Sequence, residues 1–117
     1  MMTIHDPTKT GKLARERFSV ALMSDAKWRK LFGAVEQFGR GHMIVKFIDV
    51  DEPRQMRFPP SLACPKAFMD TIEFGPVELR AIEWLELPID LAPIVDPIGK
   101  FPLVPTEFGT RVIGYQS

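Results

Sequence analysis

The stretch AIEWLELP, residues 81–88, decides how the middle of the chain folds, because its pattern fits either a strand or a helix. As a strand over residues 79–87, it places apolar and charged side chains on both alternating faces. As a helix that begins at Pro76, it forms one apolar stripe: Val77, Ala81, Trp84 and Leu85. We favour the strand, which makes this stretch part of a sheet.

Glu83 and Glu86 are the acidic residues of this stretch, and their geometry follows from that choice. In a strand, their odd separation sends the two side chains to opposite sides of the sheet. In a helix they are neighbours on one flank, where Arg80 would pair with Glu83. In a sheet, Lys46 is a possible cross-strand partner for either glutamate. Neither arrangement provides the convergent carboxylates that general acid–base catalysis requires, so we interpret both as structural or interface charges.

The 117 residues have the size and composition of one ordinary globular domain. The chain is 45% hydrophobic and 26% charged, and no apolar run approaches the roughly 20 residues that cross a bilayer. Residues 1–12 include an early Asp6 and lack the apolar run of a signal peptide. Cys64 is the single cysteine and has no partner for a disulfide within the chain. We therefore expect a cytoplasmic protein without a membrane partner.

Two amphipathic helices are predicted near the N-terminus, where residues 1–8 are expected to be frayed. The first helix covers residues 8–23, and its apolar stripe is Leu13, Ala14, Phe18, Ala21 and Leu22. The second begins at a cap, Ser24 or Asp25, and ends at Gly39. Its stripe is Trp28, Leu31, Phe32, Val35 and Phe38. We predict that the two helices form a bent pair or hairpin with a basic outer surface.

The stretch HMIVKFIDVD (42–51) is rich in branched and aromatic residues and is apolar on both alternating faces, which is typical of a central strand. DEPR (51–54) predicts a turn, and QMRF (55–58) predicts an antiparallel return that ends at Pro59. These two strands are therefore expected to be neighbours in an antiparallel sheet.

Residues 61–74 are expected to contain a short helix that begins at Pro65, and TRVIGYQ (110–116) predicts a last strand. Together the elements predict a single α+β domain over residues 1–117. In this prediction an N-terminal helix pair packs on an antiparallel sheet of about four strands, and a proline-rich segment covers part of the sheet.

That segment, residues 88–109, has five prolines, which exclude a continuous helix or a central strand. It is nevertheless too apolar for a disordered linker, and a long irregular connection in a compact domain is often functional. Two interpretations are open: an ordered coat over the sheet, or an arm or groove that binds another chain. In the second case the contact residues would be Ile94, Val95, Ile98, Phe101, Leu103 and Val104.

The net charge is zero, but the basic residues are concentrated in the first part of the chain. Residues 1–46 have nine Lys or Arg against four Asp or Glu, whereas residues 47–117 have six against eleven. The opposite charges of the two halves can pair within one molecule or between two molecules. Alternatively, the basic half can bind nucleic acid. In KWRK (27–30), helical spacing places Trp28 on the apolar stripe, which argues against its stacking on a base.

Few residues have the spacing that catalysis or metal binding requires. The acidic residues within 49–52 lack the pattern of a calcium loop and are expected to solvate a turn. His5 and His42 have no cysteine or second histidine at zinc spacing. Cys64 lacks the local sequence of a catalytic thiol and is expected to be a small buried residue. We predict no catalytic residue, no metal site and no cofactor.

The pair KWRKLF (27–32) and IEWLEL (82–87) resembles a pattern in small bacterial proteins of α+β type, some of them toxin-immunity or interaction modules. The match covers 12 of the 117 residues. This resemblance implies a strand at residues 82–87 and a role in binding a partner in preference to an enzymatic role.

The leading functional hypothesis is a bacterial cytoplasmic protein-interaction module, which binds an unknown protein partner or itself through residues 88–109 and the acidic second half. One alternative is a small-molecule-binding protein or minor enzyme with a pocket between helices and sheet. The residues expected to line that pocket are Trp28, His42, Glu83 and Trp84. A second alternative is nucleic-acid binding through the basic helices, which would depend steeply on salt.

Overall fold

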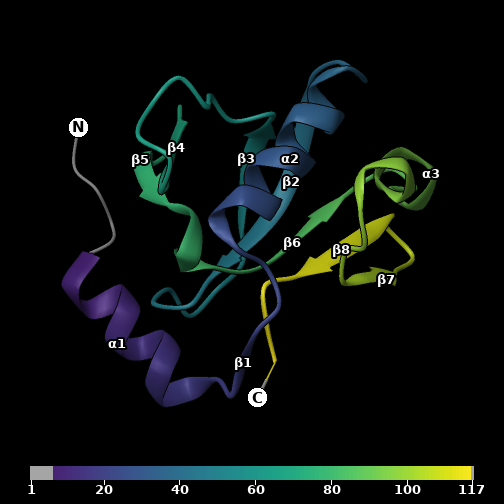
Figure 1. Cartoon of the computed structure of the whole chain (residues 1–117). Coiled ribbons are helices and arrows are strands. Elements are labelled where there is room, and N and C mark those ends of the chain that lie inside the picture. The colour runs from purple at the N-terminus through teal and green to yellow at the C-terminus, as the bar shows by residue number, and fades with distance from the viewer. Residues whose placement is uncertain (1–6, 117) are drawn as a thin grey trace.

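The computed structural model describes residues 7–116 and has the α+β architecture that the sequence predicts (Figure 1). Its centre is an antiparallel sheet of five strands, in the order β3–β2–β6–β8–β7, where about four strands were expected. These strands are β2 (Gly41–Phe47), β3 (Arg54–Phe58), β6 (Ile82–Leu87), β7 (Leu103–Pro105) and β8 (Thr110–Ile113).

Smaller elements surround this sheet. Two pairs of short strands lie outside it: β1 (Val20–Ala21) with β9 (Tyr115–Gln116), and β4 (Phe68–Thr71) with β5 (Gly75–Glu78). The helical elements are α1 (Pro7–Arg17), α2 (Asp25–Glu36), α3 (Ala92–Val95) and the 3-10 turns η1 (Leu79–Ala81) and η2 (Asp96–Ile98). None of the helices among residues 7–116 has the length and apolar composition needed to span a bilayer.

Helix α2 covers one face of the sheet, and its sequence explains its boundaries. Ser24, one of the two predicted caps, is the N-cap, and its Oγ accepts a hydrogen bond of 3.1 Å from the backbone N–H of Lys27. Gly39 follows the helix with a positive φ of 99°, which glycine adopts without steric cost. Phe38 was expected on the apolar stripe, but it is 62% exposed because the helix has already ended at Glu36. The stripe residues that reach the core are Trp28, Leu31, Phe32 and Val35.

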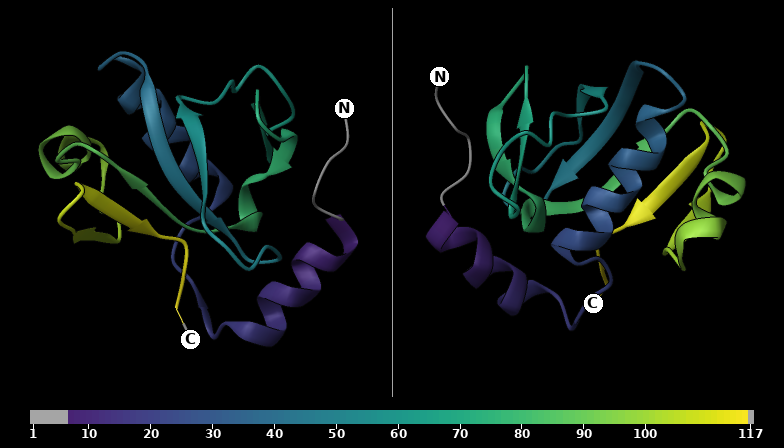
Figure 2. Two further views of the ribbon diagram at one scale, coloured as in Figure 1. Left: turned by 180° about the vertical axis from the view of Figure 1, so that it is seen from behind. Right: turned by 45° about the horizontal axis from the view of Figure 1, so that its top comes forward.

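Helix α1 does not extend the way the sequence pattern predicts. It ends at Arg17, and Val20–Ala21 pairs with β9 instead of continuing the helix to residue 23. The predicted helix pair is not formed: α1 packs against η1 at one end of the sheet, away from α2 (Figures 1 and 2). Arg17 fixes its end by donating from Nη1 to the carbonyl oxygen of Ile48 at 2.6 Å. The predicted fraying of residues 1–8 falls mainly outside the described residues, and α1 begins at Pro7.

Strands β2 and β3 confirm the predicted central strand and its antiparallel return, with Met43 opposite Met56. The predicted short helix at Pro65 is wrong, because residues 68–71 pair with residues 75–78 as the β4–β5 hairpin. The predicted last strand is divided at Gly114 into β8 and β9, which join different sheets.

Residues 88–109 are held to the domain by their apolar side chains. Leu91 and Val95 are fully buried in the core. Thr110 ties the segment to the sheet, because its Oγ1 accepts from the Leu91 N–H at 3.1 Å and donates to the Ile89 carbonyl at 2.8 Å. Four more side chains of the segment pack against the core and are partly buried: Ile89, Ile94, Phe101 and Leu103.

Several cations of the basic first half bind carbonyl groups of the second half. Arg29 donates from Nη2 to the Leu62 carbonyl at 2.6 Å and from Nη1 to the Phe68 carbonyl at 3.2 Å. Lys27 donates to the Lys100 carbonyl at 3.2 Å. The two halves therefore satisfy part of their polar groups within one molecule.

Candidate interaction surface

The face of the central sheet opposite α2 is uncovered: no helix of residues 7–116 lies over it (Figure 2, left). Residues that are partners across neighbouring strands share a face, so the register defines this surface, which we call the open face. Its members are His42, Ile44, Lys46, Gln55, Arg57, Glu83, Trp84, Glu86, Val104, Arg111 and Ile113.

A bulge in β6 puts both glutamates on the open face. Lys46 lies opposite Trp84, and the next residue of β2 lies opposite Ile82, so Glu83 is an extra residue without a partner on β2. The carbonyl of Glu83 instead accepts from the Gly114 N–H at 2.7 Å. The prediction that Glu83 and Glu86 point to opposite sides was wrong, because regular alternation is interrupted at this residue.

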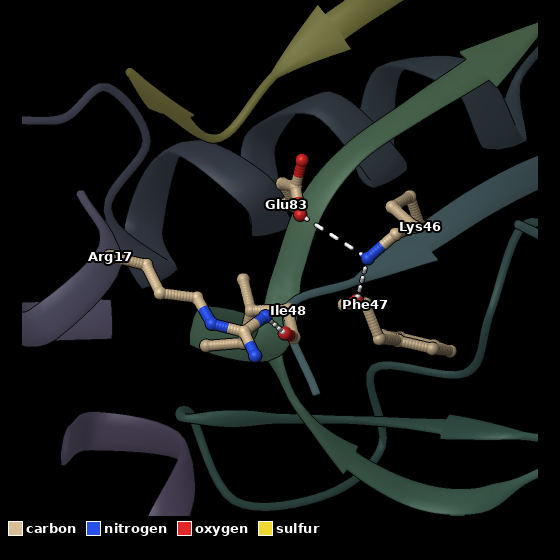
Figure 3. Close-up of polar contacts among 5 residues, drawn as sticks. All are labelled: Arg17, Lys46, Phe47, Ile48 and Glu83. Atoms are coloured by element: carbon tan, nitrogen blue, oxygen red, sulfur yellow. Dashed lines mark hydrogen bonds and ion pairs between the residues drawn. The ribbon is translucent and has the colours of Figure 1, made fainter. Parts of the chain in front are cut away.

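Glu83 and Lys46 form an ion pair that fixes the bulge. Lys46 Nζ lies 3.3 Å from Glu83 Oε1 and also donates to the Phe47 carbonyl at 2.7 Å (Figure 3). This is the predicted cross-strand pairing of Lys46 with one of the glutamates. Arg80, which a helix would have placed beside Glu83, pairs with Glu78 at 3.0 Å. Glu83 therefore has a structural partner on the open face.

Trp84, Glu86 and Arg111 form the centre of the open face. The Arg111 guanidinium lies 3.8 Å from the centroid of the Trp84 ring, and its Nε lies 3.1 Å from Glu86 Oε1. The Glu86 side chain is only 8% exposed, so its carboxylate depends on this partner. A cation stacked on tryptophan contributes about 0.5–2 kcal/mol. The cluster presents a flat aromatic and guanidinium surface on which the charges of Glu86 and Arg111 offset each other.

Apolar side chains extend this centre on both sides. Ile44 and Ile113 are half-buried beside it, and Val104 on the edge strand β7 is 45% exposed. Phe108, in the β7–β8 turn, is 48% exposed and borders a shallow groove of about 390 Å³. The groove is lined by His42, Met43, Ile44, Pro53, Arg54, Gln55 and Phe108.

The structure distributes the predicted contact residues of the proline-rich segment over different environments. Val95 is fully buried, and the half-buried Ile94, Phe101 and Leu103 pack against the core. Ile98 is exposed but lies on η2, outside the sheet. Val104 alone among these six lies on the open face.

The predicted pocket between helices and sheet is not formed, because its four residues are not brought together. Trp28 is fully buried on the core side of α2, where its ring stacks on Phe32 at 6.0 Å between centroids. Glu83 and Trp84 lie on the opposite face of the sheet, and His42 lies at the start of β2. The space beneath α2 is filled by core side chains.

The larger groove, about 840 Å³, lies where the C-terminal end of α2, the end of β3 and the β4–β5 hairpin meet. We call it the hairpin groove. His42 is the only predicted site residue that lines it. The remaining titratable residues were not predicted, because only strand register brings them together: Glu36, Arg40, Arg57, Asp70 and Glu73. In the part of the chain that the structure describes, no three His, Cys, Asp or Glu side chains cluster as metal ligands.

A further cluster of titratable groups lies where the first turn of α2 approaches η1 and β9. Burial raises the pKa of Asp25 above its ordinary value of 3.8, although the Arg80 guanidinium acts in the opposite direction. Burial also raises the pKa of Tyr115, whose hydroxyl donates to the Arg80 carbonyl at 2.6 Å. Because Phe18 stacks on Tyr115 at 4.9 Å between centroids, this cluster holds the chain between α1 and α2 in place.

No protein-family model matches the chain, and comparisons with curated proteins and with solved structures find no match. The functional proposals below are therefore based on the geometry of the surfaces described above.

Proposed function

We propose that the protein is a protein-interaction module that binds a partner polypeptide across the open face. The observation that carries this proposal is the Trp84–Arg111–Glu86 cluster, which lies at the centre of a sheet face that no described helix covers. Tryptophan and arginine are the residue types most often found at the energetic centre of protein interfaces.

The surroundings of the cluster resemble the usual composition of an interface. Ile44, Ile113 and Val104 supply apolar contact area around it, and Lys46 with Glu83 supplies charge near its edge. With an apolar centre and a polar rim, a bound partner excludes water from the centre of the interface, while water remains at its edge. Because the charged groups are already paired, a partner would have few unsatisfied charges to desolvate.

The proline-rich segment has two roles in this proposal. Its first part, with Leu91 and Val95, covers the core. Its second part presents Val104 and Phe108 beside the cluster, so that a partner would contact the β7–β8 hairpin together with the sheet.

Two observations argue against the alternative functions. A ligand between helices and sheet would have to displace Trp28 and its neighbours, which are fully buried. For nucleic acid, Lys27 and Arg29 are already bonded to carbonyls of the same chain. Fewer helix cations are therefore free to contact phosphates.

Photo-crosslinking in the native host tests the proposal. A photoreactive amino acid at Val104 or Ile113 should yield a crosslink to another polypeptide, and Val104→Glu should abolish the crosslink from position 113. Val104 lies on a short edge strand and is 45% exposed, so this charge should leave thermal stability nearly unchanged. A crosslink to a second copy of the chain would identify the partner as the protein itself.

Phe38 provides the matched control, because it is an exposed aromatic residue, 62% accessible, outside the open face. A photoreactive group at position 38 should give no specific product. The proposal would be contradicted if positions 104 and 113 gave no crosslink, or if position 38 gave the same product as they do.

A further inference from the structure

The two edges of the central sheet differ in how open they are to another strand. At one edge, β7 is three residues long and is bounded by Pro102 and Pro105, which have no N–H to donate. At the other edge, β3 is five residues long, and although Pro53 and Pro59 flank it, no proline lies within the strand. An edge with free backbone groups is a template for strand addition, so β3 is the edge where addition is possible.

One hydrogen bond shows which backbone groups of β3 face outward. The N–H of Arg57 donates to Glu73 Oε2 at 3.2 Å, so it points away from β2. Backbone direction alternates along an antiparallel strand, and the N–H of Gln55, two residues away, therefore also points outward. Arg57 and Gln55 thus provide the outward-facing row of donors and acceptors along this edge, where the Arg57 N–H is occupied by Glu73.

Glu73 occupies the position that a partner would take at Arg57. Its carboxylate accepts from the Arg57 N–H and also lies 3.8 Å from Arg57 Nε. One carboxylate is therefore held by the backbone and the side chain of the same residue. Arg57 is exposed, so this carboxylate is held at the surface, where another can replace it.

The hairpin groove borders this end of β3 and has a volume within the range of ligand sites. Its wall on the strand side has Arg40, His42 and Arg57, with Glu36 at the end of α2, whereas its wall on the hairpin side has Asp70, Glu73 and the exposed Ile72. The imidazole of His42 and the guanidinium of Arg57 belong to direct cross-strand partners. An extended segment beside β3 would meet positive charge on its open-face side.

We propose that an extended peptide segment with a carboxylate side chain opposite Arg57 adds to β3 as a sixth strand and replaces Glu73 there. Strand addition supplies affinity through backbone hydrogen bonds and specificity through alternate side chains. Charge complementarity selects an acidic residue at the position that faces Arg57 and His42. This site differs from the centre of the open face, so it stands or fails independently of the proposed function.

A designed probe tests the inference: the acetylated and amidated heptapeptide TVTEVTV, with TVTKVTV as its matched partner. Both are titrated into the full-length ¹⁵N-labelled protein while the backbone amides of Gln55 and Arg57 are followed by NMR. The glutamate peptide should shift both amides and bind about tenfold more tightly than the lysine peptide, because the charged hydrogen bond is lost in the latter. Glu73→Ala should tighten binding of the glutamate peptide, whereas Glu107→Ala, at an exposed site elsewhere, should not change it.

Proline at position 55 separates strand addition from ordinary charge attraction. Gln55→Pro removes the outward N–H and leaves the ladder with β2 intact, so the fold should persist while binding falls about tenfold. Gln55→Ala keeps the N–H and should bind as the natural chain does. Equal binding by these two variants would overturn the inference, as would equal binding of the two peptides or the absence of shifts in the Glu73→Ala protein at millimolar peptide. Val104→Glu should leave peptide binding unchanged, which distinguishes this site from the centre of the open face.

Discussion

The two faces of strand β6 differ sharply although they are built from six consecutive residues. Ile82, Leu85 and Leu87 are fully buried in the core. Glu83, Trp84 and Glu86 lie on the open face, where they contact Lys46 and Arg111. A regular strand would mix these two sets, and the bulge at Glu83 separates them. The comparison shows that one inserted residue can give a strand a purely apolar face and a face suited to binding.

Gly114→Ala should have the largest effect, because it removes the support of the bulge. A Cβ at this position would overlap the carbonyl oxygen of Ile82 and lie 2.9 Å from that of Glu83. Both atoms belong to the backbone and cannot move away cheaply, so we expect a loss of more than about 4 kcal/mol in the free energy of unfolding.

Gly33→Ala is the matched control, since nothing lies within 4 Å of its added Cβ in the middle of α2. This variant should gain about 0.5–1 kcal/mol through helix propensity. Urea denaturation of both variants measures the difference. A mild effect of Gly114→Ala would mean that β6 can form without this bulge.

Leu85→Ala and Ile113→Ala compare the two faces directly. Leu85 is fully buried, and its truncation should cost about 2–5 kcal/mol, from lost burial and the cavity that remains. Ile113 is half-buried on the open face, where the loss should be about 1 kcal/mol. Equal losses in chemical denaturation would show that something covers the open face in the isolated protein.

Arg111→Ala tests the charged centre of the open face. It leaves the carboxylate of Glu86, 8% exposed, without its partner, so stability at neutral pH should fall by about 1–3 kcal/mol. Combining Arg111→Met with Glu86→Leu removes both charges and should recover most of this loss. If the double variant is no more stable than the single one, lost packing on Trp84, rather than the unpaired charge, accounts for the effect.

Asp25→Asn should have the smallest effect, visible as a dependence on pH. Burial raises the pKa of Asp25 in the folded protein above 3.8, so the folded state binds this proton more tightly than the unfolded chain. The stability linked to Asp25 is therefore complete below pH 3.8 and is lost as the pH rises through the folded pKa. Relative to the asparagine variant, the natural chain should lose stability on this rise. Denaturation curves of both proteins from pH 3 to pH 7 give the sign of this pH dependence. A gain in the stability of the natural chain relative to the variant as the pH rises would contradict the prediction.

The sequence was informative where local chemistry determines the structure. Ser24 predicted a helix cap, and the branched residues of β2 predicted a central strand. The predicted helix over residues 8–23 failed because Val20–Ala21 finds a distant partner in β9, which local pattern does not reveal. The hairpin at residues 68–78 was also missed, although the Gly75–Pro76 pair was a signal for a turn.

The candidate surfaces could be predicted only in part, because they depend on the register between strands and on which elements cover each face of the sheet. Glu83 and Trp84 were recognised as candidates, but regular alternation predicted the wrong side for one of the two glutamates. Arg111 was not recognised, since its place over Trp84 follows from the pairing of β6 with β8. Similarly, only the β2–β3 register places His42 beside Arg57.

Hydroxyl-radical footprinting would test most directly whether the open face binds a partner. The labelling of Trp84, Ile113 and Phe38 is compared between the purified protein and the same protein in gently prepared extract of its host. Binding across the open face predicts that Trp84 and Ile113 lose label in the extract, while the exposed Phe38 is labelled equally in both. Equal labelling of Trp84 in the two samples would contradict the proposal that this face binds a partner.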